Sequence, residues 1–213
     1  PYPNNMGMYL YGYQQGGKLN KQVAFFKEGA SCNVLVLKEG EHTSLRVNGK
    51  VDATNGGDME TQLGLAYFPR FLRPDARNVL IIGFGSGTSA GTSLLFPNTK
   101  VTCCEIEPAV FAASRHFADV NHSPEHSADF SLVVDDGRSY LQATPQQYDF
   151  IISEPSNPWI AGIANLYTKE FFAIAKQKLN PNGLLVQWIQ AYSFSPSDFA
   201  MIVRSASQEF PHC

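Results

Sequence analysis

The sequence predicts an α/β fold in which helices cover both faces of a mostly parallel sheet, preceded by a small antiparallel β unit. Strand-like and helix-like patterns alternate from residue 78 to residue 209, and such alternation is typical of parallel strands joined by crossover helices. A glycine-rich turn directly follows the first buried strand of this series. Before residue 58, short strand-like runs are separated by Glu-Gly and Asn-Gly turns, which predicts antiparallel hairpins.

The N-terminal quarter divides into an arm and a β unit. Residues 1–17 are rich in Tyr, Gly, Asn and Gln without any period, so we expect an irregular arm. Residues 18–57 form the predicted β unit, in which Asn48-Gly49 is a strong hairpin signal. About thirty residues of strand hold little core alone, so we expect the unit to pack against the domain of residues 58–213. Its strand-like runs are Gln22–Lys27, Asn33–Lys38, Thr43–Val47 and Val51–Ala53.

The larger domain begins with a helix predicted from Asp58 to Leu72, with Asp58 as its candidate N-cap. Five strands then follow, separated by helices or turns. The predicted strands are Val79–Ile82, Val101–Cys104, Phe130–Val134, Tyr148–Ser153 and Leu184–Ile189. The predicted helices are Thr88–Leu95, Ala109–Phe117, Arg138–Ala143, Tyr167–Leu179 and Ser197–Glu209.

Composition excludes several classes of function. The net charge is −3, and no Lys/Arg cluster is interleaved with aromatic residues, so nucleic acid is not an expected partner. His122 and His126 are separated by Ser-Pro and have no third ligand nearby, so we expect no metal. The four cysteines lack C-x-x-C spacing, which favours reduced thiols and a cytoplasmic protein. Because the chain starts at Pro1, we expect a fragment, and a membrane segment outside it stays open.

The stretch N-V-L-I-I-G-F-G-S-G-T, residues 78–88, is the strongest local signal. Its buried strand runs into Gly83, Gly85 and Gly87, which allow a sharp turn and a close approach of backbone to a ligand. The following helix directs its first amides at that ligand, as in nucleotide-binding α/β sheets. Thr88 occupies the sixth place of the dinucleotide pattern, so S-adenosylmethionine or a derivative is favoured over NAD. A purely structural turn is the alternative.

Polar residues follow the other predicted strands, and ligands of such sheets lie beyond the carboxyl ends of the strands. Glu105 can accept hydrogen bonds from ribose hydroxyls, and Asp136 can accept one from an adenine amino group. Glu154 follows the next strand within E-P-S-N-P. Each acid alone has an alternative as a helix cap or ion-pair partner, but polar ends on neighbouring strands together favour a ligand site.

The order of several motifs resembles the spermidine synthase (polyamine aminopropyltransferase) family, especially its bacterial branch that is often fused to membrane segments. These motifs are I-I-G-F-G-S-G, C-E-I-E-P, D-D-G-R-S-Y-L, Y-D-F-I-I-S-E-P-S-N-P and N-L-Y-T-K-E-F-F. The resemblance implies a Rossmann-like, methyltransferase-type sheet after a small N-terminal β unit, and a homodimer. It also implies that an aminopropyl group passes from decarboxylated S-adenosylmethionine to an amine or polyamine.

The resemblance also implies roles for individual residues. Glu154 matches the catalytic acid that accepts a proton from the attacking amine. The residues implied to hold the nucleoside are Gly83, Gly85, Ser86, Gly87, Glu105, Ile106, Asp136 and Gly137. The residues implied to contact the substrate are Asp58, Gln62, Asn157, Trp159 and Tyr167.

Departures from the family pattern leave alternatives open. Ser86 and Asn157 stand where the family carries aspartates, and each lost charge at ~4 Å from a cation forfeits on the order of 4 kcal/mol before desolvation. Neutral Ser86 would also tolerate the carboxylate of intact S-adenosylmethionine. The alternatives are therefore methyl or aminocarboxypropyl transfer, or a non-catalytic nucleoside-binding domain of a membrane protein.

Overall fold

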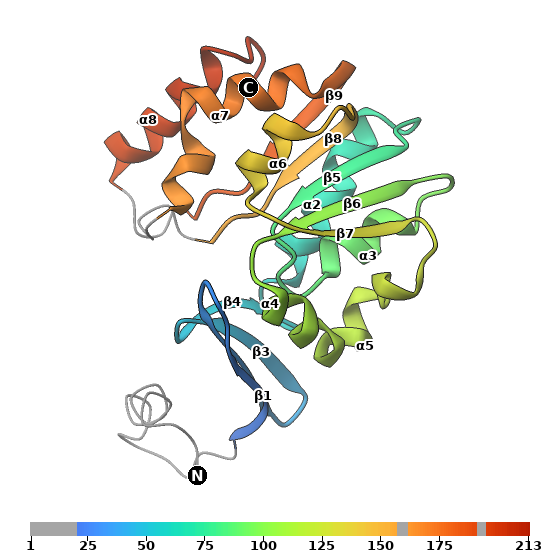
Figure 1. Cartoon of the computed structure of the whole chain (residues 1–213), viewed down its shortest axis with the longest axis vertical. Coiled ribbons are helices and arrows are strands. Elements are labelled where there is room, and N and C mark those ends of the chain that lie inside the picture. The colour runs from blue at the N-terminus through green and yellow to red at the C-terminus, as the bar shows by residue number, and fades with distance from the viewer. Residues whose placement is uncertain (1–20, 157–161, 191–194) are drawn as a thin grey trace.

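The computed structural model describes residues 21–156, 162–190 and 195–213. These residues form an α/β structure with two sheets (Figure 1). The first sheet is antiparallel in the order β1-β2-β3-β4, and the second is parallel in the order β7-β6-β5-β8-β9. This architecture confirms the predicted fold class.

The antiparallel sheet is built from consecutive hairpins. Its strands are β1 (Lys21–Glu28), β2 (Asn33–Glu39), β3 (His42–Val47) and β4 (Lys50–Thr54). Between β3 and β4, Asn48 and Gly49 both have positive φ, 49° and 85°, as a two-residue hairpin turn of this kind requires. Val34, Val36 and Leu45 join the core on one face of the parallel sheet, so the β unit packs against the larger domain as expected. The division into an arm of residues 1–17, a β unit of residues 18–57 and a larger domain of residues 58–213 stays a prediction.

The parallel sheet places β5 (Asn78–Ile82) at its centre, between β6 (Lys100–Glu105) and β8 (Tyr148–Ser153). The outer strands are β7 (Phe130–Val134) and β9 (Leu179–Gln187). The chain runs outward to one side through β6 and β7 and then to the other through β8 and β9. The strand order therefore reverses at β5, and ligands of such sheets bind in the crevice at this reversal.

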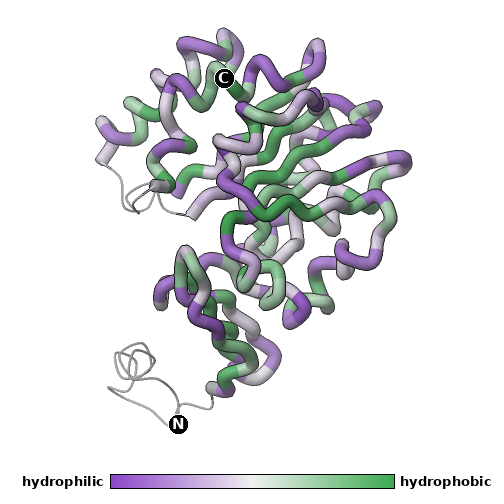
Figure 2. Tube along the Cα trace, viewed as in Figure 1, coloured by the Kyte–Doolittle hydropathy of each residue, from purple (hydrophilic) through white to green (hydrophobic). Residues whose placement is uncertain are grey.

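Helices cover both faces of the parallel sheet. On β5, Val79 and Ile81 enter a core shared with α3 and α4, while Leu80 and Ile82 enter a second core shared with α6, α7 and α8. The central strands are the most apolar part of the chain (Figure 2). The helices are α2 (Met59–Leu72), α3 (Thr88–Leu94), α4 (Pro108–Ala113), α5 (Ala118–Asn121), α6 (Gly137–Ala143), α7 (Lys169–Gln177) and α8 (Pro196–Ser207), with 3₁₀ turns η1 (Ser114–Phe117), η2 (Pro124–His126) and η3 (Ile163–Tyr167). Within the described ranges, no helix has the length and apolarity needed to cross a membrane.

Two local expectations were wrong. The helix predicted over Tyr167–Leu179 is shorter at both ends. Thr168 has an extended backbone and its Oγ1 accepts the Phe171 amide, so α7 begins at Lys169, and Leu179 already begins β9. Asp58 precedes α2, but its carboxylate does not cap the helix. It instead accepts hydrogen bonds from the Thr54 amide at 3.0 Å and from Gln62 Nε2 at 3.0 Å.

Candidate active site

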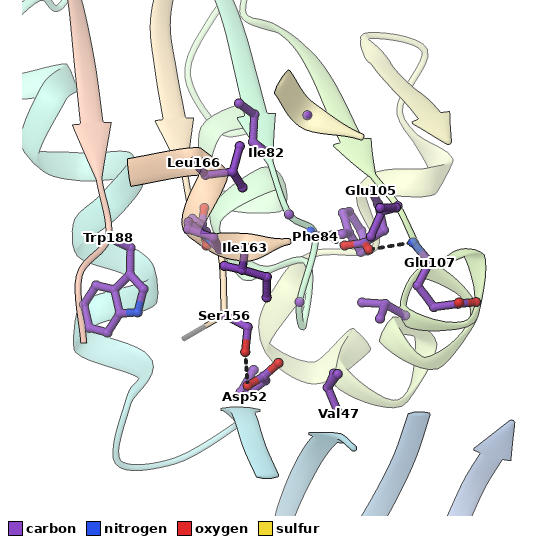
Figure 3. Close-up of a pocket in the computed structure, with 18 of the residues that line it drawn as sticks. Val47, Asp52, Ile82, Phe84, Glu105, Glu107, Ser156, Ile163, Leu166 and Trp188 are labelled. Atoms are coloured by element: carbon purple, nitrogen blue, oxygen red, sulfur yellow. Dashed lines mark hydrogen bonds between the residues drawn. The ribbon is translucent and has the colours of Figure 1, made fainter. Parts of the chain in front are cut away.

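A cavity of about 450 Å³ lies at the strand-order reversal, where the antiparallel sheet faces the carboxyl ends of the parallel strands (Figure 3). Its wall includes residues from β4, α2, the loop after β5, and the ends of β6, β7 and β8. The polar residues that the sequence places after these strands therefore line one common cavity.

The glycine loop forms one side of this cavity. Gly83 and Gly85 line it with φ of 90° and 53°. A Cβ on Gly83 would stand 2.8 Å from the Glu154 carbonyl oxygen, so glycine lets the loops after β5 and β8 pass close together. Gly87 was expected to line the site but is not among the lining residues. Gly87 is instead the N-cap residue of α3, with a left-handed φ of 84°. A Cβ on Gly87 would meet the Phe84 ring.

A chain of three side chains connects α2 to the glycine loop along the cavity wall. Ser86 is buried and its hydroxyl donates to Gln62 Oε1 at 2.5 Å. Gln62 Nε2 in turn donates to Asp58 Oδ2 at 3.0 Å. All three residues line the cavity. The Ser86 hydroxyl proton is thereby committed to Gln62.

Glu105 ends β6 with both carboxylate oxygens turned toward backbone amides. Oε2 accepts from the Phe84 amide at 2.8 Å and Oε1 from the Glu107 amide at 2.9 Å. Burial raises the pKa of Glu105, and these amide bonds partly oppose the shift. Neighbouring Ile106 is exposed and gives the cavity an apolar surface. Glu107 caps α4 at Ala109 and also accepts the Ser31 amide, so it connects the two sheets' domains.

The loop after β7 brings Asp136 and Gly137 into the cavity wall. Asp136 Oδ1 accepts the Ser139 amide at 2.8 Å and caps α6, which was the alternative role for this acid. Its second oxygen accepts no hydrogen bond from the described residues. A Cβ on Gly137 would lie 2.3 Å from Ile82 Cγ2, so glycine allows α6 to start directly against β5.

Glu154 follows β8 and is held beneath the glycine loop. Its amide donates to the Ile82 carbonyl at 2.9 Å, and its Oε2 accepts from Ser89 Oγ at 2.9 Å. Oε1 is buried and has no partner among the described residues. Burial raises the pKa of Glu154 to about 8, against the opposing effect of the Ser89 bond. The cavity wall thus contains a carboxyl group that can hold or release a proton near neutral pH.

Tyr167 was implied to contact the substrate but is not among the residues that line the described cavity. Tyr167 is buried and absent from the lining, because its hydroxyl binds the carbonyls of Ser156 and Trp188 at 3.3 Å and 3.2 Å. It braces the loops after β8 and β9. Asn157 and Trp159 lie outside the described residues.

The structure adds lining residues that the sequence did not indicate. Asp52 on β4 accepts a hydrogen bond from Ser156 Oγ at 3.0 Å (Figure 3). An acid between Val51 and Ala53 in a short strand is an ordinary pattern for a solvated edge, so the sequence carried no signal for it. Ile163, Leu166 and Trp188 add apolar surface to the cavity (Figure 3).

The charge of the cavity wall has one sign. Its described lining residues include seven acids and neither lysine nor arginine. The acids are Asp52, Asp58, Glu105, Glu107, Asp135, Asp136 and Glu154. A low-dielectric hollow of this kind attracts cations and disfavours anions.

Comparison with known proteins agrees with this geometry. Residues 60–213 match the family model described as the spermine/spermidine synthase domain. A polyamine aminopropyltransferase of Sulfolobus acidocaldarius is 29% identical over 174 residues, which cover 78% of this chain and 56% of the relative. A spermidine synthase of Dictyostelium discoideum is 27% identical over 161 residues, which cover 75% of this chain and 53% of the relative.

Among solved structures, a spermidine synthase in complex with the transition-state analogue AdoDATO shares this fold. It matches with a TM-score of 0.81 and 22% sequence identity, over 89% of this chain and 66% of that chain. The chain spans about half the length of the curated relatives it matches.

Proposed function

Because the chain belongs to the spermine/spermidine synthase family, we propose that it transfers an aminopropyl group from decarboxylated S-adenosylmethionine to an amine acceptor. The observation that carries this proposal is the cavity wall with seven acidic side chains and no lysine or arginine among its described residues. Both reactants, a sulfonium with an ammonium tail and a protonated amine, are cations. The acidic wall favours both of them.

The same wall argues for the decarboxylated donor over intact S-adenosylmethionine. A methionine carboxylate would need a cation or a free hydrogen-bond donor, since a buried unpaired charge is costly. The lining supplies no lysine or arginine, and the Ser86 proton already goes to Gln62. The acidic Asp58 lies directly behind Gln62 and adds repulsion. Methyl and aminocarboxypropyl transfer are therefore the less favoured reactions.

The residues around the strand ends fit an adenosine. Each Glu105 oxygen uses one lone pair on a backbone amide and retains another for a ribose hydroxyl. Asp136 retains Oδ2 for a donor on the base, and exposed Ile106 offers an apolar surface on which the base can lie. Gly83 and Gly85 leave room for the thioether end of the nucleoside.

Glu154 is the proposed proton acceptor. The amine nitrogen forms a bond to the aminopropyl carbon next to sulfur, the C–S bond breaks, and its electron pair stays on sulfur as a neutral thioether. Glu154 removes the proton from the amine. With its pKa raised to about 8, the carboxyl lies roughly two units below an alkylammonium near 10, so the proton transfer is far less uphill than to an ordinary carboxylate.

The test is a product analysis with each donor. We incubate the protein with decarboxylated or intact S-adenosylmethionine and a panel of amines, and measure methylthioadenosine and S-adenosylhomocysteine. We expect methylthioadenosine from the decarboxylated donor in an amine-dependent manner. S-adenosylhomocysteine would establish methyl transfer instead. Tight binding of the decarboxylated donor with neither product would make the protein a nucleoside-binding domain and overturn the proposal.

The remaining expectations concern assembly and location. We propose a homodimer in the cytoplasm, in line with the resemblance of the motifs to the family. Light scattering on the purified chain gives the assembly state directly, and a monomer mass would contradict it. A membrane segment outside residues 1–213 stays a prediction.

A further inference from the structure

Ser89, in the first turn of α3, contacts the proposed proton acceptor, and the reaction above gives it no role. Ser89 is buried, and its Oγ lies 2.9 Å from Glu154 Oε2 and 3.0 Å from the Gln62 carbonyl oxygen. A serine hydroxyl has one proton to donate. Ser89 can therefore donate fully to one of these two oxygens at a time, and the nearly equal distances favour neither.

The charge of Glu154 decides which oxygen receives the Ser89 proton. When Glu154 is ionised, Oε2 is the stronger acceptor, and Ser89 donates to it. In the protonated acid, Oε2 either still accepts the Ser89 proton or donates its own proton to Ser89 Oγ, whose proton then turns to the Gln62 carbonyl. This exchange rotates a hydroxyl hydrogen and moves no heavy atom. Oε2 therefore has a hydrogen-bond partner in both charge states.

The second carboxylate oxygen, Oε1, is the one left for a ligand. It is buried and has no partner among the described residues. Because Ser89 holds Oε2, the carboxylate cannot turn freely, and Oε1 keeps a fixed direction. Glu154 lines the cavity, so an amine bound there can supply the hydrogen bond that Oε1 lacks.

Helix α2 fixes Ser89 from the side opposite Glu154's carboxylate bond. The Gln62 carbonyl that faces Ser89 belongs to α2, and the Gln62 side chain accepts the Ser86 hydroxyl at 2.5 Å. Two serines around the start of α3 thus bind one residue of α2. A carbonyl inside a helix already accepts an amide from the next turn. The Gln62 carbonyl therefore does not require the Ser89 proton and can release it to Glu154.

We propose that Ser89 positions Glu154 for the reaction: it holds Oε2 in both charge states of the acid and leaves Oε1 to remove the proton from the amine. Ser89 is not among the residues that line the cavity, so it acts through Glu154. The inference rests on the proposed aminopropyl transfer and assigns a positioning residue to it.

Other ionisable groups lie around Glu154, and their charges act on the same titration. The buried thiol of Cys103 on β6 is one of them, since the charge of Glu154 contributes to raising its pKa. A change at Ser89 leaves all of these groups in place, so a difference between variants reports the loss of the hydroxyl. The ionisable groups that line the cavity with Glu154 are Asp52 on β4, Asp58 before α2, Glu105 at the end of β6, Glu107 before α4, Asp135 and Asp136 after β7, and the thiols of Cys32 and Cys104.

The experiment compares Ser89→Ala and Ser89→Thr with Ser93→Ala, the same change at a buried serine one turn later in α3 that does not line the cavity. We measure kcat from pH 6 to pH 10 with decarboxylated S-adenosylmethionine and a saturating concentration of the amine that gives most product. Ser89→Ala removes a donor to the ionised acid, which is the reactive form. The pH of half-maximal kcat should therefore rise by about one unit, the difference between a hydrogen bond to a charged group and one to a neutral group.

The same variant should also lower kcat at high pH about threefold or more, because a carboxylate that turns freely is oriented less often for the reaction. Ser89→Thr keeps the hydroxyl and should stay within about twofold of the wild type with an unshifted profile. Ser93→Ala should match the wild type.

A purely structural Ser89 would give a different pattern. A loss of kcat that is equal at every pH would mean that Ser89 only packs α3 against α2, and it would overturn the proposal. An equal effect of Ser93→Ala would overturn it as well, as would a Ser89→Thr protein that behaves like Ser89→Ala. Where Ser89→Ala does not fold, Ser89→Cys provides the same test, because a thiol is a weaker donor than a hydroxyl.

A titration without turnover separates this inference from the proposed function. Carbon-13 NMR of glutamate-labelled protein follows the ionisation of the Glu154 carboxyl, and Glu154→Gln identifies its resonance. Ser89→Ala should move this titration to higher pH by about one unit, and Ser93→Ala should not move it. If the wild type forms no product but the titration moves in this way, Ser89 holds the carboxylate and the transfer reaction fails. If the wild type turns over and Ser89→Ala changes neither the kcat profile nor the titration, the transfer reaction stands and the inference fails.

Discussion

At the scale of single residues, the buried carboxyl of Glu154 combines two features that are costly for stability. Oε1 lacks a partner among the described residues, and burial raises the pKa of the side chain to about 8. Perturbed carboxyl groups in a cavity are typical of functional sites, because a structural acid would be paired or exposed. Both features have measurable consequences.

The first consequence is for catalysis. Glu154→Gln removes the proton acceptor but keeps the shape, so we expect aminopropyl transfer to fall at least about a hundredfold. Calorimetric affinity for methylthioadenosine should stay within about twofold of the wild type, because Glu154 removes a proton and does not hold the nucleoside. An unchanged rate would show that another group accepts the proton.

The second consequence is for stability. The pKa of Glu154 is raised in the folded protein from 4.5 to about 8, so the folded state binds the proton more tightly than the unfolded state. The contribution of Glu154 to the free energy of unfolding is greatest below pH 4.5, falls as the pH rises toward 8, and then levels off. Glu154→Gln cannot ionise, so its Tm relative to the wild type should increase from pH 5 to pH 9. Calorimetry measures both Tm values, and a constant difference between the variant and the wild type from pH 5 to pH 9 would contradict the raised pKa.

At the scale of elements, the site depends on how closely the loops after β5 and β8 pass. Gly83 has φ of 90°, and a Cβ would stand 2.8 Å from a backbone oxygen that cannot rotate away. Gly137 solves the same problem where α6 starts against Ile82. Backbone spacing at these two points positions Glu154 and Asp136 in the cavity wall.

We expect Gly83→Ala to destabilise the protein by about 1–3 kcal/mol through strain and overpacking. It should also lower kcat more than it raises the KM for the amine, since the displaced loop carries Glu154. Gly57→Ala is the matched control, because Gly57 is exposed and a Cβ there meets nothing within 4 Å. Urea unfolding and steady-state kinetics give the two readouts. Equal behaviour of the two variants would refute the role of close loop packing.

At the scale of the whole molecule, the cavity is a feature of two sheets. The parallel sheet supplies most of the acids at its strand ends, and the antiparallel sheet supplies Asp52 from the facing side. Glu107 connects the two by accepting the Ser31 amide while it caps α4. Docking of the β unit therefore adds Asp52 to the acids at the ends of the parallel strands and completes the acidic wall.

This field predicts different salt dependence for the two kinds of ligand. Raising the NaCl concentration from about 50 to about 500 mM screens charges and should weaken binding of 1,4-diaminobutane several-fold. Binding of uncharged methylthioadenosine should change by less than about twofold, because it depends on hydrogen bonds and apolar contact. Calorimetry at both salt concentrations tests the prediction, and equal changes for both ligands would count against an electrostatic site.

Features that depend only on neighbouring residues could be predicted from the sequence. A β-branched run followed by glycines predicts a buried strand and a loop with positive φ, because both follow from local sterics. The same reasoning placed Glu105, Asp136 and Glu154 at neighbouring strand ends, since the carboxyl ends of parallel strands lie at one edge. It also placed the hairpin at Asn48-Gly49, where two residues set the turn.

Contacts between residues far apart in the chain could not be predicted from the sequence and are seen only in the folded structure. Asp52 meets Ser156 across 104 positions, and Glu154 meets Ser89 across 65, so neither contact leaves a pattern in the local sequence. The raised pKa of Glu154 arises because α3 and the glycine loop exclude water from a carboxylate that by sequence alone could be solvated. The sequence also could not show that Tyr167 donates hydrogen bonds to the loops after β8 and β9 rather than facing the cavity. The direction of a buried ring depends on how distant residues pack around it.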